Sequence, residues 1–230
     1  MNKYELTSET SQYVGHILHR IKALKDFGSV KAGELGGWIE SEENLSQTDN
    51  AWVYNNAKVF DKARVYGDAA VSDDAIVCGD AKVYDKAIVY GEALICGAAE
   101  VCGKVEVFDM VRVYGTARVC GDAWVFGDAC ICGEAVVFGR IAVYGGAKIM
   151  GNAKVCNNAD YIVFKNFWSS GRYFTWTRSN NMWSVGCFYG TGEELIEKAY
   201  IDSNTSGREY ERVVGYVESI LADEKKERSN

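Results

Sequence analysis

The feature that most constrains this chain is a six-residue repeat that runs without interruption through residues 51–158. The run divides into 18 units, such as AKVFDK, ARVYGD and ARVCGD. The first position is Ala in 15 units, the third is always Val or Ile, and the fifth is always Gly, Asp or Asn. A fixed period of this kind indicates a repeat architecture, in which each unit buries its apolar side chains against its neighbours.

Each column of the repeat predicts a structural role. Alternation of small, variable and β-branched residues is typical of a short strand whose first and third positions face inward. Gly, Asp and Asn tolerate positive φ, so the fifth position predicts a tight corner. Three units then close one turn of parallel β-coil, and the run gives six turns. A helix is excluded, because glycine or a β-branched residue stands at nearly every other position.

The repeat resembles a known family. An aliphatic residue is followed four positions later by a small one, as in Val53 with Ala57 or Val59 with Ala63. This pattern is similar to that of the hexapeptide-repeat, left-handed β-helix proteins, in the bacterial and phage subset that includes proteins classed as acetyltransferases. Residues 21–46, with LGGWI at their centre, resemble the N-terminal cap of that subset. The resemblance implies a left-handed coil, whereas the spacing alone also allows a right-handed triangular coil, as in bactofilin-like filament proteins.

We therefore predict a mainly β chain with three parts. Residues 1–38 form an N-terminal cap with a strand near residues 15–23, because an open coil end exposes unpaired backbone groups. Residues 39–158 form a triangular left-handed parallel β-helix of about six to seven coils. Residues 159–230 form a small α/β domain of β-β-β-α-α order, which caps the other end or packs along a flank.

The C-terminal segment carries its own signals. Strands are predicted around residues 161–167, 172–177 and 183–188. Two helices follow, since Thr191-Gly-Glu-Glu194 and Ser206-Gly-Arg-Glu209 each match a capping box.

Composition excludes several classes. The net charge is −7 and no segment has a surplus of basic residues, so a nucleic-acid binder is disfavoured. No apolar run reaches the roughly 18 residues of a membrane span, and the first residues do not look like a signal peptide. In a chain without these signals, eight cysteines indicate reduced thiols rather than disulfides. We therefore expect a protein of the bacterial cytoplasm, encoded either by the bacterium or by a phage.

Two histidines limit the enzymatic interpretation. The resemblance implies acyl transfer from CoA by a histidine base on a loop that leaves the coil, or zinc held between subunits. His16 and His19 are the only histidines, and both fall in the cap. Catalysis would require the cap to fold over a subunit groove, and the alternative is two polar residues on a cap strand. We predict no catalytic centre, no cofactor and no metal site.

The outward positions predict an interface. Several large apolar residues would point outward and form a patch larger than a monomer usually exposes. We assign it to contacts between copies of this chain, in a trimer by resemblance or in a dimer; coverage by the C-terminal helices is the alternative. The cysteines of the repeat serve as apolar fillers, with stacked metal or redox sites as the alternative. The interface residues are Ile76, Ile88, Leu94, Phe108, Trp124, Phe126 and Cys130.

Aromatic residues and arginines also cluster in the C-terminal segment. They predict either a recognition surface for a partner or the core of a half-buried sheet. The residues are Trp168, Arg172, Tyr173, Trp176, Arg178 and Trp183.

These features together predict a non-catalytic, oligomeric scaffold that binds a protein partner, with a phage-borne inhibitor of a host defence complex as one version. An acetyltransferase that uses CoA and a bactofilin-like filament are the alternatives. The N-terminal cap and the C-terminal domain both argue against end-to-end filament growth.

Overall fold

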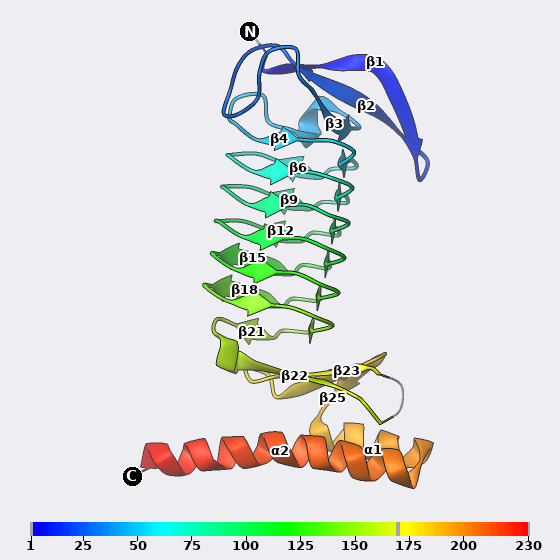
Figure 1. Cartoon of the computed structure of the whole chain (residues 1–230), viewed down its shortest axis with the longest axis vertical. Coiled ribbons are helices and arrows are strands. Elements are labelled where there is room, and N and C mark those ends of the chain that lie inside the picture. The colour runs from blue at the N-terminus through cyan, green and yellow to red at the C-terminus, as the bar shows by residue number, and fades with distance from the viewer. Residues whose placement is uncertain (1, 169–170, 230) are drawn as a thin grey trace.

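A computed structural model of the chain describes residues 2–168 and 171–229. The chain forms a β-solenoid, with a strand hairpin at its N-terminal end and a small sheet with two helices at the other end (Figure 1). The predicted mainly β fold with two C-terminal helices is therefore confirmed, while the left-handed winding and the triangular section stay predictions.

Within the described ranges, the repeat strands form three parallel sheets, which we name after their first repeat strands. The β4 sheet contains β4 (Trp52–Val53), β7 (Ala70–Val71), β10 (Ile88–Val89), β13 (Glu106–Val107), β16 (Trp124–Val125) and β19 (Ala142–Val143). The β5 sheet contains β5 (Lys58–Val59), β8 (Ile76–Val77), β11 (Leu94–Ile95), β14 (Arg112–Val113), β17 (Cys130–Ile131) and β20 (Lys148–Ile149). The β6 sheet contains β6 (Arg64–Val65), β9 (Lys82–Val83), β12 (Glu100–Val101), β15 (Arg118–Gly121), β18 (Val136–Gly139) and β21 (Lys154–Val155).

The first and third positions of the repeat form one continuous core. Ala57 and Val59 are fully buried, and so are their counterparts in nearly every unit. Each strand pairs in register with its counterpart in the next turn, so that Val53 lies beside Val71. Alanine fits the first position because an inward side chain next to a corner has little room. The predicted alternation is confirmed.

The fifth position forms the corners. Asn55 and Asp61 have φ of 52° and 58°, and glycines of this column lie between 62° and 90°. Asn157 is the exception, with φ of −149°, because it caps the short 3-10 helix η2 (Asn158–Asp160) instead. The sequence did not reveal a second role for the aspartates. Each accepts a backbone hydrogen bond from the glycine one turn further on, as Asp61 does from Gly79 at 3.0 Å.

The N-terminal cap is an antiparallel hairpin of β1 (Tyr4–Tyr13) and β2 (His16–Ala23). The sequence predicted the second strand but not the first. β3 (Leu35–Ile39) pairs with β2 on one side and with β5 on the other, so the cap continues the β5 sheet. Beyond β3 the chain passes through the 3-10 helix η1 (Glu42–Asn44) and enters the repeat.

The cap seals the core over Trp52. This indole stands at an outward position of β4, yet it is fully buried because Tyr4 and Phe27 pack edge-on against it, with ring centroids 6.0 and 5.3 Å away. Lys3 is buried beside them and donates a hydrogen bond from Nζ to the carbonyl oxygen of Ala51 at 2.8 Å.

The C-terminal segment contains one more strand than predicted. Its antiparallel sheet runs in the order β22 (Tyr161–Lys165), β23 (Tyr173–Thr177), β24 (Met182–Val185) and β25 (Phe188–Gly190). The prediction of a single strand over residues 183–188 was wrong, because Gly186 adopts a φ of 59° and turns the chain.

Two helices follow the sheet, α1 (Gly192–Asp202) and α2 (Asn204–Ser229). The capping box of Thr191 and Glu194 is confirmed. The second predicted cap was wrong: Ser206 lies inside α2, and its amide donates to Ser203 Oγ at 3.0 Å. Neither helix in the described chain combines the length and the apolar character needed to cross a membrane.

The small sheet closes the end of the solenoid. Tyr161 donates its hydroxyl hydrogen to the carbonyl of Ala142 at 2.7 Å, and the ring of Tyr173 lies directly on Gly146. A β-carbon at Gly146 would collide with that ring, so glycine is required here. Figure 1 shows α1 and α2 on the far side of this sheet, away from the solenoid. The helices therefore do not cover the flank on which the interface was predicted.

Candidate functional site

The seven residues of the predicted interface lie around one corner of the solenoid, between the β4 and β5 sheets. Ile88 and Trp124 point outward from the β4 sheet. Ile76, Leu94 and Cys130 stand at the equivalent positions of the β5 sheet and are half-buried. Phe108 and Phe126 lie at the corner itself, between the two groups.

A stack of four rings follows this corner. Tyr90, Phe108, Phe126 and Tyr144 occupy the same position in successive turns, with neighbouring ring centroids at 4.9, 5.2 and 5.6 Å and nearly parallel planes. The repeat causes the stack, because equivalent positions of successive turns are separated by one strand spacing of about 4.8 Å. Trp124 is 56% exposed, Tyr144 55% and Ile88 39%. We call these four rings, with the five outward residues of the preceding paragraph that flank them, the aromatic corner.

The other long flank of the solenoid is charged. On the β6 sheet, Glu100 forms ion pairs with Lys82 at 3.0 Å and with Arg118 at 3.2 Å. The charged groups of such surface ion pairs remain in contact with water, so each pair adds little to the stability of the fold. The aromatic corner is thus distinguished from the β6 face by its chemistry.

A hollow of about 440 Å³ lies beside Trp124. Its rim carries both signs of charge, with Lys104 and Arg140 alternating with Asp122 along the axis. An apolar centre with a polar rim of this kind is typical of protein–protein interfaces.

His16 links the hairpin to the coil. Its Nδ1 lies 2.9 Å from Glu40 Oε1, its Nε2 lies 3.6 Å from Asp61 Oδ1, and its ring packs on Phe60. The other oxygen of each carboxylate accepts a hydrogen bond from a backbone amide. Glu40 accepts from the amide of Asp61, and Asp61 accepts from the amide of Gly79. His19 lies apart, near the carbonyl of Thr7.

Two carboxylates favour the charged imidazole. The hydrogen bond with Glu40, reinforced by the charges of Glu40 and Asp61, raises the pKa of His16, and the same contact lowers the pKa of Glu40. Ligand atoms of these three residues lie within 4.8 Å of one another, so they could hold a divalent cation if His16 lost its proton. As placed, with one carboxylate at each ring nitrogen, the group is an ion-pair bridge.

This bridge predicts a pH-dependent hairpin. Since the pKa of His16 is raised by folding, its stabilising contribution is fully present below the unfolded value of about 6.5 and is lost as the pH rises through the folded value. We expect the protection factors of the β1 and β2 amides, which are corrected for the intrinsic rise of exchange with pH, to fall above that pH. Hydrogen exchange across pH 5.5 to about 8.5 measures this. This fall in protection should vanish in His16→Asn and persist in His19→Asn; an unchanged fall in His16→Asn contradicts the bridge.

The predicted C-terminal residues divide between core and surface. Trp176 and Trp183 are buried in the core between the sheet and the helices, and Trp168 packs half-buried against the ring of Tyr210. Tyr173 contacts the solenoid, as described above. Two arginines remain.

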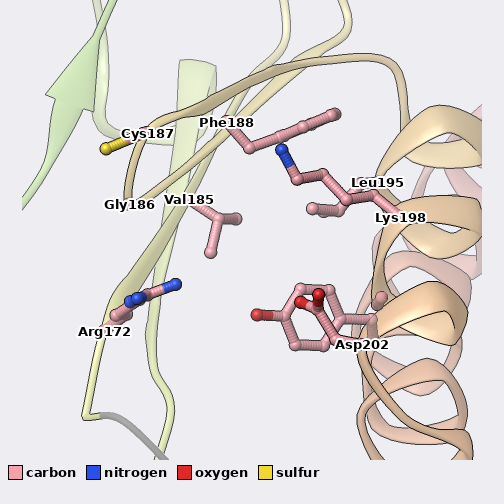
Figure 2. Close-up of a pocket in the computed structure, with 10 residues that line it drawn as sticks. Arg172, Val185, Gly186, Cys187, Phe188, Leu195, Lys198 and Asp202 are labelled. Atoms are coloured by element: carbon pink, nitrogen blue, oxygen red, sulfur yellow. The ribbon is translucent and has the colours of Figure 1, made fainter.

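Those two arginines differ in their partners. Arg178 makes two hydrogen bonds to Glu224, at 2.6 and 3.0 Å, and lies over the ring of Trp176. Arg172 instead lines a pocket between the sheet and the helices (Figure 2).

Comparison with known proteins agrees with the repeat. The profile of the YdcK β-solenoid repeat matches residues 63–79. Over 63 residues the chain is 36% identical to the uncharacterized acetyltransferase YdcK of Escherichia coli (strain K12), a match that covers 24% of this chain and 19% of that protein. The chain is a hexapeptide-repeat β-helix protein. The profile match covers β6, β7 and β8 of the repeat.

The cysteines of this hexapeptide-repeat protein are free thiols of two kinds. Cys102 and Cys120 stack with sulfur atoms 2.8 Å apart, and burial raises the pKa of Cys120 to about 12. Cys130 differs, because its hydrogen-bonding contacts with Cys132 and Tyr114, helped by nearby Lys148, lower its pKa despite burial. Sequence reasoning missed this difference, since it depends on the neighbours that the coil brings together.

Proposed function

We propose that this protein is a non-catalytic, oligomeric scaffold whose copies associate through the aromatic corner and which presents its remaining surface to a protein partner. The observation that supports this is the ring stack beside an exposed Trp124. Closed ends on the solenoid disfavour growth into a filament by end-to-end stacking.

The aromatic corner has the properties of an interface. Large apolar groups that remain in water are costly, about 25 cal/mol for each Å² that a partner could cover. Aromatic side chains are enriched in interface cores, and a stack fixed by the backbone loses little entropy on binding. By resemblance to hexapeptide-repeat proteins the assembly is a trimer, in which each copy would contribute one such corner around a three-fold axis.

The partner in this proposal is a protein of a bacterial cytoplasm. A rigid solenoid holds its outward side chains at fixed spacing, which suits a display surface. The resemblance to phage proteins suggests one specific form of this role, in which a phage-encoded protein inhibits a host defence complex.

The test is the mass of the native assembly after a charge is placed in the corner. Trp124→Glu should dissociate the oligomer to the monomer of 25.4 kDa, because burying an unpaired carboxylate is strongly unfavourable. Native mass spectrometry measures the result directly.

The matched control is Val136→Glu. Val136 stands at the same repeat position in the same turn, but on the charged β6 sheet. It should leave the oligomer intact. A monomeric wild-type chain, or equal masses for both variants, would overturn the assignment of the corner as the interface.

A second candidate function, acyl transfer, is favoured by the contact of His16 with Glu40 at 2.9 Å. A carboxylate that orients a histidine is a common arrangement for a general base, and a relative matched over part of the chain carries the name acetyltransferase. In this candidate His16 loses its proton and its Nε2 turns from Asp61 to the substrate. This candidate predicts micromolar binding of acetyl-CoA that is lost in His16→Ala. Absence of binding at about 1 mM cofactor would eliminate it.

A further inference from the structure

The pocket beside Arg172 lies between the C-terminal sheet and the helices. It has a volume of about 240 Å³. Its floor is apolar, formed by the buried side chains of Val185 and Leu195. Charged groups stand around the opening: Figure 2 shows Arg172 on the sheet side and Lys198 and Asp202 on the helix side.

The charged groups of this pocket are uncommitted. Within residues 2–168 and 171–229, the side chains of Arg172 and Asp202 have neither a hydrogen-bond partner nor an ion-pair partner. Among the residues that the structure describes, Lys198 has no ion-pair partner, and its Nζ lies 5.8 Å from the ring centroid of Phe188. Arg178 shows the contrast, since it is fully paired with Glu224.

Tyr210 connects the opposite charges. Its ring is held by Phe174 at 4.6 Å and by Trp168 at 6.3 Å, and it lines the pocket. Burial raises the pKa of Tyr210, while Arg172 lowers it and Asp202 raises it. Both charges thus lie close enough to act on the same hydroxyl, so a cation and an anion face one small cavity.

Size and chemistry together restrict the ligand. The cavity is smaller than the roughly 300–1,000 Å³ typical of drug-sized ligands, so a nucleotide or CoA does not fit inside it. A simple anion would meet Asp202, and a simple cation would meet Arg172 and Lys198. A molecule that carries a carboxylate and an ammonium group on one carbon, together with an apolar tail, would complement both the charged groups at the opening and the apolar floor.

We propose that this pocket binds a free α-amino acid with an apolar side chain. Its carboxylate pairs with the guanidinium of Arg172, whose fork geometry suits two parallel hydrogen bonds. Its ammonium group pairs with Asp202, and its side chain lies on Val185 and Leu195. Lys198 strengthens the field at the carboxylate from the helix side.

The structure supports the rigidity of this site. The side chain of Arg172 passes over Gly186, and this turn is fixed to the solenoid because the carbonyl oxygen of Gly186 accepts a hydrogen bond from Lys148 Nζ at 2.6 Å. The same loop leads into β25 and α1, so the two walls of the pocket are joined by a short stretch of chain.

Calorimetric titration of the full chain with L-leucine, L-methionine and L-phenylalanine tests the proposal. At least one should bind with a dissociation constant below about 1 mM. Arg172→Gln and Asp202→Asn should each weaken it by about tenfold or more, whereas Arg208→Gln and Asp223→Asn, on the exposed surface of α2, should not. Circular dichroism confirms that each variant is folded.

Analogues separate the two contacts. The deaminated acid of the best ligand lacks the partner of Asp202, and the decarboxylated amine lacks the partner of Arg172; each should bind about tenfold more weakly. Shifts of the Val185 and Leu195 methyl resonances should accompany binding. No saturation by any of the three amino acids at about 10 mM, or equal affinity for either analogue, would overturn the proposal.

Discussion

Replacing Trp52 with alanine is expected to lower the free energy of unfolding by about 3–5 kcal/mol, because it empties a fully buried site that Tyr4 and Phe27 cannot fill. Water would then reach the first turn of the core, and the hairpin would lose its main apolar contact with the coil. Chemical denaturation followed by fluorescence of the remaining tryptophans measures the change.

Two control variants make this prediction specific. Trp124→Ala changes the same repeat position four turns away, where the indole is exposed in the single chain, and should cost the dissociated monomer less than about 1 kcal/mol. Trp52→Phe should cost less than Trp52→Ala, since the ring is kept and the buried Nε1, which has no hydrogen-bond partner among the described residues, is removed. Equal losses for Trp52→Ala and Trp124→Ala would show that the cap does not seal the core.

Replacing Gly103 with valine is expected to be similarly damaging, by about 3–5 kcal/mol. Its φ of 83° is unfavourable for a β-branched residue, and a β-carbon would lie 2.5 Å from the carbonyl oxygen of Gly121 in the next turn. The backbone of two adjacent turns would have to separate, which would weaken ladder hydrogen bonds between them. Thermal unfolding followed by circular dichroism measures the loss.

The matched control is Asp85→Asn, one turn before Gly103 in the same column. Asp85 has a φ of 59°, which asparagine accepts, and the amide oxygen can still receive the hydrogen bond from the Gly103 amide. Its cost should stay below about 1 kcal/mol. A small cost for Gly103→Val, with an unchanged melting curve, would show that the corners are deformable.

Much of the solenoid could be predicted because each six-residue unit contains the residues that determine its own strand and corner. The alternation within each unit decides which side chains are buried, and the fifth column decides where the chain turns. Because three units close one turn, residues 18 apart in the sequence lie next to each other in successive turns. Ile88 and Trp124 could therefore be placed on one sheet, and Phe108 and Phe126 on one corner, from the sequence alone.

Other features depend on contacts that no local pattern encodes. Trp52 and Trp124 occupy equivalent positions, and only the folded cap makes one of them core and leaves the other exposed. The contact of His16 with Asp61 joins residues that are distant along the chain and requires the hairpin to bend over the coil. The pocket at Arg172 likewise depends on the turn at Gly186 and on the packing of α1 against α2.

The strict register of the coil has a consequence for how the length of this protein can change. Each turn returns the chain to the same position one strand spacing further along, so removing residues 87–104 joins two equivalent points. The shortened chain would keep both terminal parts, and each remaining strand would still pair with an equivalent strand of the next turn. The solenoid would become about 4.8 Å shorter. Deletions that are not whole turns would rotate one end relative to the other. Height in this molecule can therefore be gained or lost by duplication and deletion of complete turns, with the orientation of the terminal parts preserved.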